Sequence, residues 1–111
     1  MLVAIINTDG TVESKEIDGS LESMQAIVGG LIQPVDLEPR ATIWVNEEGL
    51  LLEMEPNRIA TDLAHEFGIH ARLFGPAFLT GGIDEDGNTL EANPEHIKVL
   101  KAYSETLLTL G

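Results

Sequence analysis

A β-hairpin at the N-terminus is the sequence feature that most restricts the fold of this chain. Residues 2–7 are a run of aliphatic and β-branched side chains that ends at the turn-forming residues Thr8-Asp9-Gly10. Residues 12–17 alternate between apolar and polar side chains, as the partner strand of such a turn does. Strand patterns on both sides of an Asp-Gly turn are a strong hairpin signal. The sequence therefore predicts a sheet that begins with an antiparallel pair.

Three further segments carry strand patterns. Residues 31–37 predict a strand at a sheet edge or with a bulge, because Pro34 has no N–H to donate to a neighbouring strand. Residues 42–46 predict a short central strand, and residues 50–54 are expected to continue it after a polar turn. Residues 76–80 are apolar and predict the last strand.

Three helices are expected beside these strands. The first begins at the N-cap Ser20 and stops at Gly29-Gly30, while Asn57 caps the second and Gly68 ends it. Asn93-Pro94 opens a C-terminal helix, with proline at its first position. Without a regular βαβ rhythm, the pattern favours an α+β fold: a small, mostly antiparallel sheet with two short helices and a C-terminal helix. The predicted buried stripe of the C-terminal helix consists of Leu100, Tyr103, Leu107 and Leu110.

Length and composition limit the class of protein. The 111 residues predict a single domain over 1–111, and 43% apolar residues suffice for one modest core. The absence of cysteine excludes disulfides, thiolate metal sites and cysteine nucleophiles. No run approaches the roughly 18 apolar residues that a membrane span needs, and the N-terminus lacks the basic region of a signal peptide. A soluble protein of the cytoplasm is expected.

The charge is strongly negative, with nineteen Asp and Glu against six Lys and Arg for a net −13. Direct nucleic-acid binding is not expected, because phosphate backbones are held by clustered Lys and Arg. The acidity has two interpretations. It keeps the protein dispersed in solution, or it forms a surface that imitates DNA toward a DNA-binding enzyme. The carboxylates are scattered, which favours the first.

The motifs that resemble catalytic or metal sites are incomplete. His65 and His70 are five residues apart, whereas a zinc-protease helix needs two histidines four apart. Asp84, Asp86 and Asn88 alternate like the front of a calcium loop, but glycine is missing from the sixth position. No Ser-His-Asp arrangement can be placed. We therefore expect no enzyme activity, no metal and no cofactor.

A candidate ligand site lies where the strand containing the only Trp gives way to the second helix. It comprises Asn46, Glu47, Glu48, Asn57 and Arg58. An arginine beside a helix N-terminus can form an anion site together with free backbone N–H groups. The alternative interpretation is a structural helix cap, with Arg58 paired to Glu55 or Asp62.

Three segments resemble one family. LESMQAIVGGLI at residues 21–32, WVNEEGLL at residues 44–51 and Pro56-Asn57-Arg58 are similar in order and spacing to a family of small uncharacterised domains of bacteriophages, mobile elements and their bacterial hosts. The resemblance covers residues 18–83 and leaves the C-terminal helix, 93–110, outside. It implies a phage-type accessory protein that acts in the cytoplasm of a bacterial host. It supplies no catalytic residues.

Two functions follow as expectations. In the first, the domain is a non-catalytic binding protein that sequesters a nucleotide-like anionic ligand of the host to counter host defence, in a pocket that a homo-oligomer would help to form. In the second, it is an acidic inhibitor, or DNA mimic, of a host DNA-binding enzyme. The acidic residues available to the second function are Glu47, Glu48, Glu53, Glu55, Asp84, Glu85 and Asp86.

Overall fold

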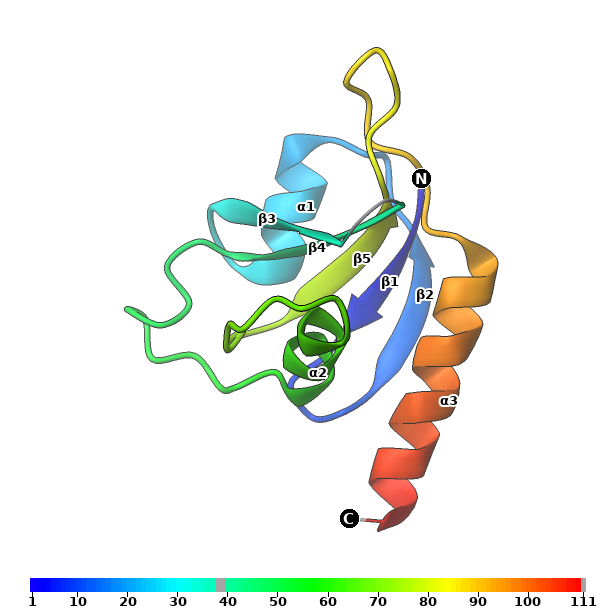
Figure 1. Ribbon diagram of the computed structural model, residues 1–111. Coiled ribbons are helices and arrows are strands. Elements are labelled where there is room, and N and C mark those ends of the chain that lie inside the picture. The colour runs from blue at the N-terminus through cyan, green and yellow to red at the C-terminus, as the bar shows by residue number, and fades with distance from the viewer. Residues whose placement is uncertain (38–39, 111) are drawn as a thin grey trace.

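A five-stranded antiparallel sheet forms the centre of the molecule in a computed structural model that describes residues 1–37 and 40–110 (Figure 1). The strands are β1 (Leu2–Ile6), β2 (Val12–Glu16), β3 (Ile32–Leu37), β4 (Ala41–Asn46) and β5 (Ala77–Gly81), and the helices are α1 (Leu21–Val28), α2 (Arg58–Glu66) and α3 (Pro94–Leu110). The strand order is β2-β1-β5-β4-β3. The predicted α+β class and the C-terminal helix are confirmed.

Two hairpins are joined by the last strand. The predicted N-terminal hairpin is confirmed, with Leu2 opposite Glu16 and Ile6 opposite Val12. β5 comes last in the sequence but lies between β1 and β4, so it connects this hairpin to the β3–β4 hairpin. Pro34 lies in β3 at the edge of the sheet, as its missing donor requires.

The two faces of the sheet carry different helices. Because side chains alternate along each strand, one face of β4 and β5 presents Ile43 and Leu79 to α2 and α3, while the other presents Trp44 and Phe78 to α1. Figure 1 shows α1 on one side of the sheet and both α2 and α3 on the other. The fold thus has three layers, and α2 and α3 share one apolar surface.

The predicted strand at residues 50–54 is wrong. These residues form consecutive turns, with the Leu52 N–H donating to the Glu48 carbonyl at 2.8 Å and the Met54 N–H to the Gly49 carbonyl at 3.0 Å. Glu53 has a positive φ of 53°, a conformation that strands exclude. β4 ends at Asn46, and beyond it the backbone satisfies its hydrogen bonds within the loop.

The predicted apolar stripe of α3 is wrong in part. Leu100 is buried, but Tyr103 is 37% exposed and Leu110 is 80% exposed, whereas Ile97 and Ser104 are buried. Figure 1 shows the last turns of α3 running past the ends of β1 and β2. No sheet surface lies beneath those turns, so apolar spacing alone does not bury them.

None of the described helices combines the length and apolar character that crossing a bilayer requires.

Candidate functional site

Asn46 links the end of β4 to the end of α1. Its side-chain Nδ2 donates to the Val28 carbonyl at 3.2 Å, and its Oδ1 accepts the Glu48 N–H at 2.7 Å. The residue is only 4% exposed. The amide therefore shapes the start of the following loop and does not face solvent.

The side chain of Asn57 makes three hydrogen bonds in the core. It is fully buried, and its Nδ2 donates to the carbonyls of Ile6 and Gly75, each at 2.9 Å. Its Oδ1 accepts the Ala60 N–H at 3.1 Å, which is the predicted N-cap of α2. One amide thus ties α2 to β1 and to the segment before β5. Like Asn46, Asn57 is buried and its side-chain amide is hydrogen-bonded within the fold, so a structural role fits both asparagines.

Arg58 lies at the first position of α2, with its side chain 74% exposed. Its Nε is 3.5 Å from Oδ2 of Asp62, one helical turn later, which is one of the two pairings that the alternative interpretation named. The same carboxylate oxygen accepts a hydrogen bond from the hydroxyl of Tyr103 on α3. These three side chains form a polar clip between α2 and α3.

The Tyr103–Asp62 hydrogen bond predicts a measurable titration. This bond is the main cause that raises the pKa of Tyr103 above its ordinary value of 10.0, and burial is the second cause. Because only the neutral phenol donates, the contribution to stability is complete below the ordinary pKa and is lost as the pH rises through the raised pKa. Tyr103 is the only tyrosine, so absorbance near 295 nm should follow it alone. Asp62→Ala should lower its midpoint; identical midpoints in both proteins would contradict the assignment.

Glu47 and Glu48 remain exposed, and they begin the most unusual surface of the molecule. Three consecutive leucines follow them, with Leu50 70%, Leu51 80% and Leu52 56% exposed. We call residues 47–55 the leucine loop. Its four glutamates are exposed, and none of them forms an ion pair within residues 1–37 and 40–110. The glutamates of the leucine loop are Glu47, Glu48, Glu53 and Glu55.

The leucine loop is held in one shape by contacts at both ends. Asn46 and the turn hydrogen bonds fix its start, and a side chain added at Gly49 would lie only 3.0 Å from the Phe74 carbonyl. At its far end, Met54 reaches back toward Gly75, where an added Cβ would lie 2.6 Å from its sulfur. The leucines therefore project from an ordered, hydrogen-bonded loop. Sequence reasoning assigned them to a strand, although three leucines after a Glu-Glu-Gly turn fit a strand face poorly because strand side chains alternate.

Two adjoining cavities lie between α2 and α3. One is about 290 Å³ and the other about 210 Å³, and they share the side chains of Leu63, Val99 and Leu100. We call them together the α2–α3 groove. Leu79 of β5 lies at its floor, and its walls are almost wholly apolar. The remaining lining residues are Leu37, Ala41, Ile59, Asp62, Glu66, Phe67, His96 and Tyr103.

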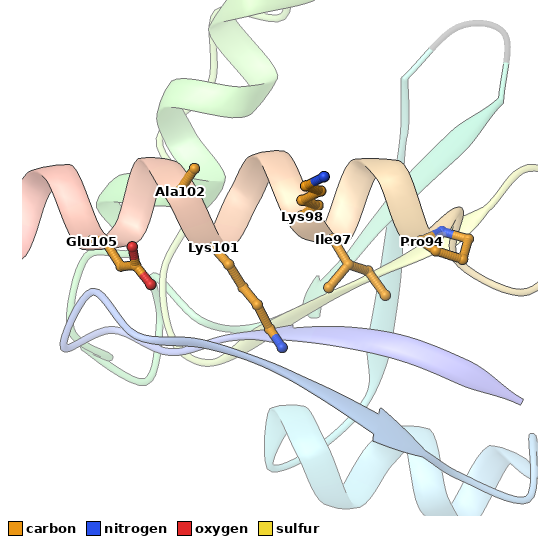
Figure 2. Close-up of a pocket in the computed structure, with 6 residues that line it drawn as sticks. All are labelled: Pro94, Ile97, Lys98, Lys101, Ala102 and Glu105. Atoms are coloured by element: carbon orange, nitrogen blue, oxygen red, sulfur yellow. The ribbon is translucent and has the colours of Figure 1, made fainter.

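A further open cavity of about 450 Å³ lies along the other side of α3 (Figure 2). Lys98 and Lys101 line it, together with Glu105. Figure 2 shows Lys101 pointing toward the strands, and its Nζ donates to Oγ of Ser14 on β2 at 3.3 Å. This cavity is the place where two of the six cationic side chains gather, although Glu105 offsets part of their charge.

Metal ligands do not gather in the part of the chain that the structure describes. No group of three or more His, Asp or Glu side chains there is arranged to hold a metal ion. The rings of His65 and His70 lie 6.1 Å apart between centroids, because the turn at Gly68 brings the second histidine back toward α2. The five residues of the predicted site line none of the cavities described above.

Comparison with known proteins identifies one family. A domain of unknown function (DUF3846) matches residues 1–107. This match confirms the resemblance to an uncharacterised domain family, and it extends beyond residues 18–83 to include the β1–β2 hairpin and most of α3. No curated protein and no solved structure was found to match the chain. Because the match spans almost the whole sequence, the chain belongs to the DUF3846 family.

Proposed function

We propose that this domain is a non-catalytic accessory protein of phage type that binds and blocks a basic host protein in the bacterial cytoplasm. The observation that carries the proposal is the leucine loop. Three large apolar side chains stand in solvent on an ordered loop, among carboxylates that form no ion pair within residues 1–37 and 40–110. Contiguous exposed apolar side chains with a polar rim are typical of protein-binding surfaces.

The two kinds of side chain in the loop have different roles in this proposal. Leu50 and Leu51 would enter an apolar depression of the partner, where burial of each contributes about 1.5–3 kcal/mol. The surrounding glutamates would attract lysine and arginine on the partner and accelerate association. Since the loop is already ordered, little conformational entropy is lost on binding.

The imitation of DNA by an extended acidic face has less support. Figure 1 places the turn containing Asp84, Glu85 and Asp86 at the top of the view, away from the leucine loop at the lower left. The seven carboxylates considered for this function therefore do not form one continuous band. A DNA-binding enzyme remains a suitable basic target, but the leucines would supply much of the contact.

Capture of a nucleotide-like anion is the second candidate, because Arg58 is exposed beside the N-terminus of α2. Its support is weaker for two reasons. The amides of Asn46 and Asn57 are bonded inside the fold, and Arg58 already pairs with Asp62. An anion would also approach through the field of a protein with net charge −13.

Retention from a bacterial extract tests the proposal with matched variants. The loop variant is Leu50→Ser/Leu51→Ser, and the control is Ile83→Ser/Leu110→Ser, whose side chains are 55% and 80% exposed in the wild type. We expect a basic protein to be retained by the wild type and the control, and the loop variant to bind it at least about tenfold more weakly. High salt should weaken retention by screening the glutamates.

Other outcomes would oppose the proposal. Equal retention by the loop variant would remove the leucine loop from the binding surface. A nucleotide released on denaturing the wild type, but not Arg58→Ala, would favour anion capture. Sedimentation that shows dimers dissociated by the loop substitutions would assign the loop to a homo-oligomer. Turnover of a nucleotide by purified protein would refute the non-catalytic role.

A further inference from the structure

The α2–α3 groove is a second apolar surface, and it is separate from the leucine loop. In Figure 1 the leucine loop lies on the side of α2 away from α3. The groove lies between the two helices. Its floor is made of core residues such as Leu79, which is 2% exposed. Its rim includes two exposed apolar side chains: Phe67 is 48% and Val99 66% exposed.

We infer that the α2–α3 groove is a docking site for an amphipathic helix that carries lysine or arginine beside its apolar stripe. Apolar grooves between two helices receive such helices through side chains at i, i+3 or i+4, and i+7. Ile59 and Leu63 on α2 and Phe67 at its C-cap are spaced by four residues and span about 12 Å, which is close to two turns of a docked helix.

The exposed rim favours a helix over a small molecule. Phe67 and Val99 line the cavities but remain 48% and 66% exposed, so a compound between α2 and α3 would cover only the part of each side chain that faces the cavity. A helix laid along the groove covers floor and rim together, which removes more apolar surface from water.

Charge determines which helix fits. Asp62 and Glu66 lie along the α2 side of the groove. Asp62 is already paired with Arg58, whereas Glu66 is exposed and forms no ion pair within the described residues. A basic flank on the docked helix would complement Glu66 and the net negative charge of the protein. A second copy of this chain is disfavoured, because each copy carries a net charge of −13.

A synthetic peptide pair tests this inference. The probe is an 18-residue helical peptide of leucine and lysine with a fluorescent label, and its partner has glutamate at every lysine position. A third peptide has the lysine probe's composition with leucines at alternate positions, which destroys the apolar helical stripe. We expect 1:1 binding of the lysine helix by fluorescence anisotropy, and at least tenfold weaker binding of the other two.

Matched protein variants locate the binding. Phe67→Ser/Val99→Ser changes two exposed rim residues and should raise the Kd of the lysine helix at least tenfold. Leu50→Ser/Leu51→Ser in the leucine loop should leave that Kd unchanged. Conversely, the rim variant should still retain the target of the leucine loop, so the two proposals can fail independently. Amide chemical shifts of the wild type should change mainly along α2 and α3, which maps the site even if a variant does not fold.

Three results would overturn the inference. Equal affinity of wild type and rim variant would show general attraction of a cationic peptide to an acidic protein. Equal binding of the alternating peptide would show that the helical stripe is not recognised. A dimer that dissociates in the rim variant would assign the groove to a second copy of the chain.

Discussion

Asn57→Ala is expected to lower the free energy of unfolding by about 3–7 kcal/mol, the larger part coming from its two donated hydrogen bonds. The substitution removes the helix cap, worth about 1 kcal/mol. It also leaves the carbonyls of Ile6 and Gly75 without their Nδ2 donor in the core, at about 1–3 kcal/mol for each. Urea denaturation followed by Trp44 fluorescence measures the change.

Ser20→Ala is the matched control for Asn57→Ala. Ser20 also caps a helix, accepting the Ser23 N–H at 3.1 Å, but it is exposed, and the Asp18 carboxylate with which its hydroxyl also interacts lies at the surface as well. Its loss should cost only about 1 kcal/mol. The difference between the two variants isolates the Nδ2 bonds of Asn57. Equal losses in both variants would mean that Asn57 is no more than a cap.

Phe78→Ala should also destabilise the fold by about 3–5 kcal/mol, because the truncation opens a cavity in the layer between the sheet and α1. Phe78 is fully buried on β5, directly opposite Trp44 on β4. The two rings are stacked, with centroids 6.1 Å apart and planes 13° apart. The loss should therefore appear both in thermal denaturation and as altered emission from Trp44 in the native state.

Phe67→Ala makes the same chemical change on the surface. Phe67 is 48% exposed beyond the last turn of α2, so its truncation should cost only about 0.5 kcal/mol. A loss below about 1 kcal/mol for Phe78→Ala would contradict a closely packed layer under α1.

The candidate site shows which features could not be predicted from the sequence. Asn46, Glu47, Glu48, Asn57 and Arg58 were grouped because they are polar and lie near one another in the chain. The tertiary structure buries both asparagines, because carbonyls from distant segments need donors there. The glutamates stay exposed on the leucine loop. The apolar residues beside them form the more distinctive surface.

Local sequence determined the elements of this protein. The Asp-Gly turn fixed the first hairpin, Ser20 and Asn57 fixed the starts of two helices, and Asn93-Pro94 opened the third. These signals act between residues at most a few positions apart, so they can be read without knowing the fold.

Only the tertiary structure decided how those elements are combined. β5 inserts between β1 and β4 through contacts between distant segments. Ile5 and Phe78, for example, lie opposite each other although they are more than seventy residues apart in the sequence. Two further features depend on the tertiary arrangement. Leu110 is exposed because α3 runs past the sheet. The groove forms because α2 and α3 pack on the same face of the sheet. Burial depends on what lies opposite a side chain, and residue spacing along one helix does not contain that information.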